Sequence, residues 1–312
     1  MARMPTRRQA LRVLAKLGGA CLLALSLAAA SGPAAAAETK AGADQTAVLL
    51  VTFGTTHASG MAGLNQVEAD LKAARPGLAV RWAYTAGKVR AILKKRGQQV
   101  DSPMEALTAL QAAGCRRVVV QSLHVIAGAE FHDLAGDLLA FCAAHPGFKA
   151  VLGRPLIGGT DDLIALTGVL LADAGPPQPG EALIWVGHGS HSPAGLTYPA
   201  LAWALNRAQP AAFLGTVEGK PDYDDVAAGL KAAGLTKARL LPLLTVVGEH
   251  SKMDIAGDEA DSWKSRLMAA GVAVTPVLKA ISEIKGVRDI WLGHLGRALQ
   301  ELDGQPAKAR KH

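Results

Sequence analysis

Short apolar runs alternate with amphipathic stretches along most of this chain. In the first half the apolar runs lie at 47–53, 78–84, 117–125 and 148–152, and the amphipathic stretches lie at 61–74, 88–114 and 130–144. The alternation then restarts, with apolar runs at 182–187, 211–217, 239–247 and 272–278 and amphipathic stretches at 161–173, 195–208, 222–233, 254–270 and 283–302. Strands this apolar, separated by helices, are typical of parallel sheets that are covered on both faces. The pattern predicts an α/β fold.

The two halves of the chain also resemble each other in sequence. LLVTFGT at 49–55 aligns with LIWVGHG at 183–189, and LHVIAGAEFHDLAGD at 123–137 aligns with LTVVGEHSKMDIAGD at 244–258. The cluster GPPQPG at 175–180 breaks regular structure near the junction, and the helix before it can belong to either half. We therefore expect two similar, doubly wound parallel-sheet lobes, at 38–157 and 158–312, with a cleft between them.

The first 37 residues have the pattern of a secretory signal peptide. Five basic residues precede an apolar stretch at 17–30, and small residues ending in Ala34–Ala37 follow it. This stretch is shorter than the roughly 20 residues that span a bilayer, so we expect no stable membrane anchor. The segment TRRQALR at 6–12 resembles a twin-arginine signal, which leaves both the Sec and the twin-arginine routes open. The sequence predicts a periplasmic protein that starts near Glu38.

Removal of this leader changes the charge of the chain. Residues 1–37 hold 5 of the 33 basic residues and none of the 26 acidic ones, so the net charge of +7 falls to +2. A nearly neutral chain gives no support for nucleic-acid binding. The sequence also has no Gly-x-x-x-x-Gly-Lys-Ser/Thr loop, so we expect no nucleotide. Cys115 and Cys142 remain in the mature chain, and the sequence leaves open whether they pair.

Three side chains capable of binding a metal follow strands of the predicted second lobe. His188 and His250 follow the apolar runs at 182–187 and 239–247, and Glu218 follows the run at 211–217. Ligands of open parallel sheets gather at the carboxyl ends of the strands, so we expect these side chains to share one cleft. Two imidazoles and a carboxylate suit an exchangeable divalent metal. Taken alone, the residues are equally consistent with hydrogen-bonded histidines at the rim of the sheet.

Several motifs together resemble those of the class II tetrapyrrole chelatases, specifically the anaerobic sirohydrochlorin cobaltochelatases of the CbiK type. The resemblance covers about 46–302 and rests on VTFGTT at 51–56, SLHVIAGAEFHD at 122–133, VGHGS at 186–190, TVEG at 216–219 and VVGEHSKMDIAGD at 246–258. It implies that the metal is held by His188, Glu218 and His250. It also implies that Glu130 in the first lobe faces the macrocycle.

The resemblance implies ATP-independent insertion of Co²⁺ or Fe²⁺ into sirohydrochlorin, a step of cobalamin or other tetrapyrrole biosynthesis. His188 and His250 then act as metal ligands and bases, with Glu218 completing the catalytic site. Because sirohydrochlorin carries several carboxylates, we expect Lys88 and Arg90 to bind it at the rim of the cleft. We expect Tyr84 to lie against the ring.

Export leaves a second interpretation open, because cobalt insertion for corrinoid synthesis belongs to the cytoplasm. The chain can instead be a periplasmic carrier of haem, another tetrapyrrole or a metal, built on a chelatase fold. His124 is then a candidate axial ligand of haem iron. The sequence does not determine the physiological metal. A homo-oligomer with twofold symmetry is the default expectation for an α/β enzyme.

Overall fold

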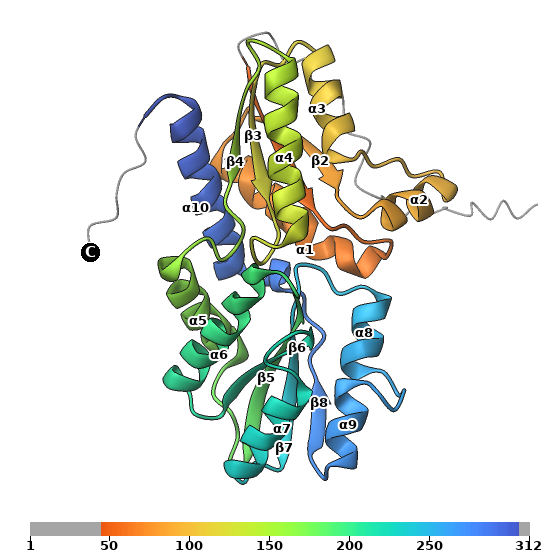
Figure 1. The fold of residues 1–312 in the computed structure, drawn as a ribbon, viewed down its shortest axis with the longest axis vertical. Helices are drawn as coiled ribbons and strands as arrows, with labels where there is room; N and C mark the ends of the chain where they lie inside the picture. Colours follow the sequence, from red (N-terminus) through yellow and green to blue (C-terminus); the bar gives the residue numbers. More distant parts are fainter. Residues whose placement is uncertain (1–44, 306–312) are drawn as a thin grey trace, which may run out of the picture. The chain divides into compact units, whose positions relative to one another are not determined.

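The computed structural model describes residues 45–305, apart from the side chains of residues 249–251. The signal peptide predicted at 1–37 lies outside the described residues. Within 45–305 no helix is long and apolar enough to cross a membrane. These residues contain two four-stranded sheets, and every strand pair in them is parallel. Helices cover both sheets (Figure 1).

The first sheet has the strand order β2-β1-β3-β4. Its strands are β1 (Thr46–Thr52), β2 (Ala79–Tyr84), β3 (Arg117–Ser122) and β4 (Lys149–Gly153). The helices between them are α1 (Ala58–Ala74), α2 (Gly87–Lys95), α3 (Pro103–Ala112) and α4 (Ala129–Ala144). The stretch predicted at 88–114 forms two helices, because Ser102 and Glu105 make a capping box that starts α3 anew, with Pro103 in its first turn.

The second sheet repeats this order, as β6-β5-β7-β8. Its strands are β5 (Glu181–Gly189), β6 (Ala212–Glu218), β7 (Lys237–Leu243) and β8 (Ala273–Pro276). The remaining helices are α5 (Thr160–Ala174), η1 (Pro193–Leu196), α6 (Thr197–Ala208), α7 (Tyr223–Ala232), α8 (Glu249–Ala256), α9 (Trp263–Ala269), η2 (Ile281–Glu283) and α10 (Lys285–Leu302). The predicted α/β fold of two similar, doubly wound lobes is confirmed.

Strand residues alternate between the two faces of each sheet, and this alternation divides the core. In β1, Val48 and Leu50 belong to a buried cluster with residues of α1 and α10, whereas Leu49 and Val51 belong to another with residues of α3 and α4. The first cluster continues into the second lobe, where it includes Trp185 of β5 and residues of α5 and α6. One apolar core therefore runs through both lobes.

The last helix of each half packs against the other half. α5 follows β4 in sequence but packs beside α6, and α10 follows β8 but packs on β3 and β4 of the first sheet. Trp291 and Leu295 of α10 are buried there. Arg288 adds hydrogen bonds to Asp70 (2.6 Å) and Gln66 (2.9 Å) of α1. The boundary at 157/158 stays a prediction, but α10, which lies in the range predicted for the second lobe, covers the first sheet.

Both described cysteines are free thiols. Cys115 is completely buried, and its Sγ lies 3.3 Å from the carbonyl oxygens of Gln45 and Arg117. Cys142 on α4 is partly buried, and burial raises the pKa of its thiol. Both side chains therefore serve as small packing groups in the first lobe.

Candidate active site

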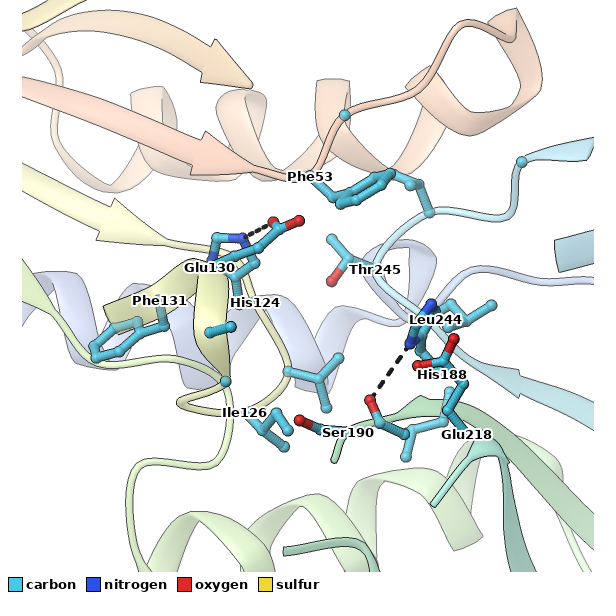
Figure 2. Close-up of a pocket in the computed structure, with 18 of the residues that line it drawn as sticks. Phe53, His124, Ile126, Glu130, Phe131, His188, Ser190, Glu218, Leu244 and Thr245 are labelled. Carbon is cyan, nitrogen blue, oxygen red and sulfur yellow. Dashed lines mark hydrogen bonds and ion pairs between the residues drawn. The ribbon is translucent and has the colours of Figure 1, made fainter. Parts of the chain in front are cut away.

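A cavity of about 430 Å³ lies at the carboxyl ends of the strands of both sheets. The segments that follow β1 and β3 line it from the first lobe, and those that follow β5 and β7 line it from the second. In each sheet these are the two central strands, between which the direction of winding reverses. Such switch points are where doubly wound sheets bind ligands. Figure 2 shows the side chains from both lobes directed into this space.

The first-lobe wall carries a chain of hydrogen bonds that ends on Glu130. Ser122 Oγ, at the end of β3, lies 2.8 Å from His124 Nδ1, and His124 Nε2 lies 3.1 Å from Glu130 Oε2. The hydroxyl of Thr85, just after β2, donates to the same carboxylate oxygen. Glu130 is in the first turn of α4. Three elements therefore hold one carboxylate at the edge of the cavity.

The environment of Glu130 favours its ionised form. Burial alone would raise the pKa of this carboxyl group, but the hydrogen bonds from His124 and Thr85 and the electrostatic interactions with the imidazoles of His124 and His188 outweigh it, so the pKa falls below 4.5. The contribution of His188 comes from the other lobe. Glu130 is thus an anion at neutral pH that faces an imidazole across the cavity.

The second-lobe wall presents His188 and Glu218 on neighbouring strands. His188 is an exposed residue of β5, and Glu218 is the last residue of β6. Between them Gly189 has a φ of +90°, and a Cβ there would lie 1.6 Å from the carbonyl oxygen of Glu218, so only glycine lets the strands approach this closely. Figure 2 shows Glu218 beside His188, with His124 and Glu130 on the other side of the cavity.

The imidazole of His188 has one nitrogen available for a ligand. Its Nδ1 lies 3.4 Å from the carbonyl oxygen of Gly189, which can only accept a hydrogen bond, so Nδ1 carries the proton. The lone pair of Nε2 then remains for a metal. His191 Nε2 lies 3.9 Å from Glu218 Oε2 at the rim, where the His191 side chain is 80% exposed.

The predicted metal set is only partly described by the structure. The side chain of His250 lies outside the described residues, although its backbone is placed in the first turn of α8. Among the side chains that are described, no group of three or more His, Cys, Asp or Glu is arranged to hold a metal. The ligand set of His188, Glu218 and His250 therefore stays a prediction.

Tyr84 and Arg90 do not reach this cavity. The Tyr84 side chain is completely buried, packs against Gly54, and donates its hydroxyl to Met61 Sδ at 3.2 Å, while burial raises its pKa to about 12. Arg90 pairs with Glu105 at 3.4 Å and lines a separate cavity of about 200 Å³. The contacts of Tyr84 and Arg90 with substrate stay predictions that this geometry does not favour, because Tyr84 is buried and Arg90 is paired with Glu105. Lys88 is exposed on the first turn of α2, beside the cavity residue Val89.

His124 lines the cavity, but both of its ring nitrogens are engaged. Its Nδ1 lies next to Ser122 Oγ and its Nε2 next to Glu130. Ligation of haem iron by Nε2 would first require its contact with Glu130 to open. The role of His124 as an axial ligand stays a prediction that this geometry does not favour.

The apolar wall of the cavity is the part that the sequence motifs did not reveal. It is contributed by Phe53 after β1, Ile126 and Phe131 after β3, and Leu244 and Val246 after β7. Phe53 is 49% exposed and lies in this wall beside other apolar side chains, which is typical of a ligand-binding cavity. The sequence does carry one sign of this apolar wall, because apolar residues continue past the ends of β1, β3 and β7.

Comparison with known proteins agrees with this geometry. Residues 46–300 match the sequence model of the family described as cobalt chelatase (CbiK). The chain is 38% identical over 258 residues to the sirohydrochlorin cobaltochelatase CbiKC of Nitratidesulfovibrio vulgaris, covering 82% of this chain and 91% of that protein. It is 33% identical over 256 residues to the sirohydrochlorin cobaltochelatase of Salmonella typhimurium, covering 81% and 96%.

The fold is also that of a solved chelatase. The structure of SirB from Bacillus subtilis with Fe³⁺ superimposes with a TM-score of 0.60 at 16% identity, covering 84% of this chain and 98% of SirB. At this identity the likeness concerns the fold alone. Because the family match extends over both lobes and the two relatives align along nearly their whole length, the chain belongs to the cobalt chelatase (CbiK) family.

Proposed function

We propose that this protein inserts a divalent metal ion, Co²⁺ or alternatively Fe²⁺, into sirohydrochlorin without using a nucleotide. Both relatives reported above are named sirohydrochlorin cobaltochelatases. The observation that carries the proposal is the pair of opposed groups, His188 on one wall and the ionised Glu130 on the other, in a cavity walled by apolar side chains. A flat macrocycle between these walls meets a metal-binding imidazole on one face and a proton acceptor on the other.

The metal is a substrate in this scheme, and the second lobe binds it. His188 offers its Nε2 lone pair, Glu218 offers a carboxylate that is half exposed, and His250 completes the proposed set. Neutral imidazoles hold a divalent ion weakly enough to release it to the ring. After the transfer, a freed imidazole can accept one of the two pyrrole protons near neutral pH.

The second pyrrole proton is assigned to Glu130. The N–H bond breaks, an O–H bond forms on the carboxylate, and the nitrogen keeps its electron pair for the metal. Glu130 is ready for this step because its lowered pKa keeps it ionised in the free enzyme. The neutral acid then returns the proton to water through the open side of the cavity.

The carboxylates of sirohydrochlorin need partners outside the cavity walls. Among the described residues that line the cavity, none is Lys or Arg. Lys88 at the start of α2 keeps its proposed role as a rim cation, because it is exposed and adjoins Val89. We expect its replacement to weaken substrate binding rather than catalysis, since Lys88 is assigned no role in metal binding or proton transfer in this scheme.

Anaerobic metal insertion tests the function. Purified protein is mixed with sirohydrochlorin and Co²⁺ or Fe²⁺, and absorbance follows the metallated ring. We expect turnover by the wild type, and a fall in kcat of about 10²-fold or more for His188→Ala and His250→Ala. His145→Ala is the matched control, because His145 bonds the Phe141 carbonyl and stacks on the Phe141 ring outside the cavity. Binding of the macrocycle by wild type without turnover would contradict the proposal and favour the carrier.

We also propose that the mature protein is periplasmic. The support is the sequence of residues 1–37, with its basic head, apolar middle and small residues before Glu38. Cell fractionation followed by N-terminal sequencing is expected to find a protein that starts near Glu38 in the periplasm. Recovery of an unprocessed chain from the cytoplasm would contradict export.

The expected homo-oligomer is likewise a proposal. It rests on the prevalence of twofold assemblies among α/β enzymes. Analytical ultracentrifugation of the mature chain is expected to give a mass that is a multiple of the protomer mass, and a single monomer peak at micromolar concentration would overturn it.

A further inference from the structure

We propose that Thr85, Ser122 and His124 are positioning residues, which hold the Glu130 carboxylate so that one of its oxygens is fixed and the other is free to take a pyrrole proton. The inference rests on the proposed function for its chemistry, but the geometry that carries it belongs to the first lobe alone. None of the three side chains is assigned to contact the metal.

The direction of the hydrogen bonds follows from the groups involved. Ser122 is completely buried, and its Oγ accepts the backbone N–H of His124 at 3.3 Å. The ionised Glu130 carboxylate can only accept, so His124 Nε2 carries a proton, and Nδ1 of the neutral ring is left to accept the Ser122 Oγ proton, 2.8 Å away. Nδ1 is then the acceptor nitrogen, and Nε2 carries the proton that it donates to Glu130 Oε2 at 3.1 Å. Ser122 thus selects the tautomer of His124 that can bind a carboxylate.

Both donors converge on one oxygen of Glu130. Oε2 accepts from Thr85 Oγ1 and from His124 Nε2, whereas Oε1 has no hydrogen-bond partner among the described residues. Thr85 is itself fixed by its backbone N–H, which donates to the carbonyl of Thr52 at 2.9 Å. Figure 2 shows the second carboxylate oxygen of Glu130 directed away from His124 and toward the cavity. The arrangement prevents rotation of the carboxylate and presents Oε1 to the ring.

The hydrogen-bond chain orients the carboxylate but does not carry the proton away. Beyond His124 the described hydrogen-bond chain ends at Ser122, which is completely buried. A proton accepted by Oε1 therefore leaves from Oε1 itself, on the cavity side. This separates the positioning residues from Glu130, which alone exchanges the proton.

The same bonds set the ionisation of Glu130. Among the described residues, the titratable groups that act on it are His124 from the first lobe and His188 from the second. Burial raises the pKa of Glu130, and the hydrogen-bond donors together with the electrostatic interactions with these two imidazoles lower it. Removing a donor leaves the burial unchanged, so the pKa rises toward or above its ordinary value.

A threonine series provides the first test. Thr85→Val removes the donor, Thr85→Ser keeps it, and Thr167→Val removes a buried hydroxyl that bonds only the Leu163 carbonyl in α5. We expect Thr85→Val to lower kcat about tenfold with KM unchanged within about twofold, and to raise the pKa of Glu130. Thr85→Ser and Thr167→Val should behave as the wild type. The pKa is read by NMR of ¹³C-labelled glutamate, with Glu130→Gln to assign the signal.

A histidine series provides the second test. His124→Gln keeps an N–H donor at the position of Nε2, and His124→Leu removes it. The kcat of His124→Gln is expected to stay within about fivefold of wild type, and that of His124→Leu to fall at least tenfold further. Ser122→Ala should give an intermediate rise in the Glu130 pKa, because His124 then loses the group that selects its tautomer.

The outcomes separate this inference from the proposed function. Absence of turnover by the wild type refutes the function, while the Glu130 titration still tests the positioning. Turnover with unchanged kcat and unchanged titration in Thr85→Val and His124→Leu overturns the positioning and leaves the function standing. Equal losses in Thr85→Val and Thr85→Ser, accompanied by a lower unfolding midpoint, indicate a structural role and also overturn it.

Discussion

Burial decides the role of individual aromatic side chains around the cavity. Tyr84 and Phe53 both lie at the carboxyl edge of the first sheet, yet Tyr84 is completely buried and Phe53 is about half exposed. Gly54, with a φ of +100°, lies over the Tyr84 ring, and a Cβ there would come within 2.3 Å of it. The sequence places both aromatics at the ends of apolar runs, but only the turn geometry reveals that Phe53, and not Tyr84, lines the cavity.

Tyr84→Phe is therefore expected to leave substrate binding unchanged. The lost hydroxyl has only the Met61 sulfur as a partner, a weak acceptor, so the free energy of unfolding should change by less than about 1 kcal/mol. Tyr84→Ala should cost about 3–5 kcal/mol, because it empties a core position. Steady-state kinetics and urea unfolding measure both effects. A large rise in KM for Tyr84→Phe at constant stability would restore Tyr84 as a substrate contact.

At the scale of elements, an ion pair joins neighbouring strands at the amino ends of the second sheet. Glu181 at the start of β5 accepts from Arg239 of β7 at 2.7 Å, and both side chains are largely buried. Arg239 also donates to the carbonyl of Ala174, at the end of α5. The hydrogen bond from Arg239 lowers the pKa of Glu181 below 4.5. Glu181 and Arg239 therefore hold the end of α5 against the second sheet, at the edge of the sheet opposite the cavity.

Glu181→Gln is expected to lower stability at pH 7 by about 1–3 kcal/mol. Because the folded-state pKa is depressed, the contribution of Glu181 is present above its unfolded value and is lost as the pH falls through the folded value. Urea unfolding at pH 7 and pH 3.5 should therefore show a gap between wild type and variant that narrows in acid. Asp289→Asn, which breaks an exposed pair with Lys285, should cost less than about 0.5 kcal/mol at either pH. If the difference in unfolding free energy between wild type and Glu181→Gln were the same at both pH values, the Glu181–Arg239 ion pair would not be the cause of the lost stability.

Most elements follow from the alternation of apolar and amphipathic segments, because a strand buried on both faces leaves a continuous apolar run. The stretch at 88–114 shows where the pattern fails. Its helical periodicity continues through a loop in which Asp101 forms a bridge to Ala83, and the break is caused by the local capping chemistry of Ser102 and Pro103. The position of His188 at a strand end was predictable from the pattern, and that of Glu130 was implied only by the family resemblance. The contacts of Arg90 with Glu105 depend on tertiary packing, which the pattern does not contain.

At the scale of the whole molecule, α10 connects the two lobes. Arg288 is 8% exposed and bonds Asp70 and Gln66 of α1 and the carbonyl of Ser282. The sequence analysis places this helix in the second lobe, because residues 285–302 follow the last predicted strand of that lobe. Which sheet it covers depends on the shared core, because its apolar face fits β3 and β4.

Arg288→Met is expected to lower the free energy of unfolding by about 2–3 kcal/mol, since Asp70 and Gln66 lose their partner in a mostly buried place. Lys285→Met on the same helix breaks only the exposed ion pair with Asp289, so it should change the free energy of unfolding by less than about 0.5 kcal/mol. Urea unfolding measures both. Equal effects of the two substitutions would show that α10 is not held through Arg288.

The path of α10 also determines the order in which the protein can be completed during synthesis. The first sheet is translated early, and α1 covers part of the face that includes Val48 and Leu50, but the part over β3 and β4 stays uncovered until residues 285–302 have left the ribosome, because Trp291 and Leu295 pack there. A nascent chain that stops before this helix exposes apolar surface on β3 and β4, and β3 is the strand that leads into the Glu130 wall. The lobe that is encoded first is therefore the one that is finished last.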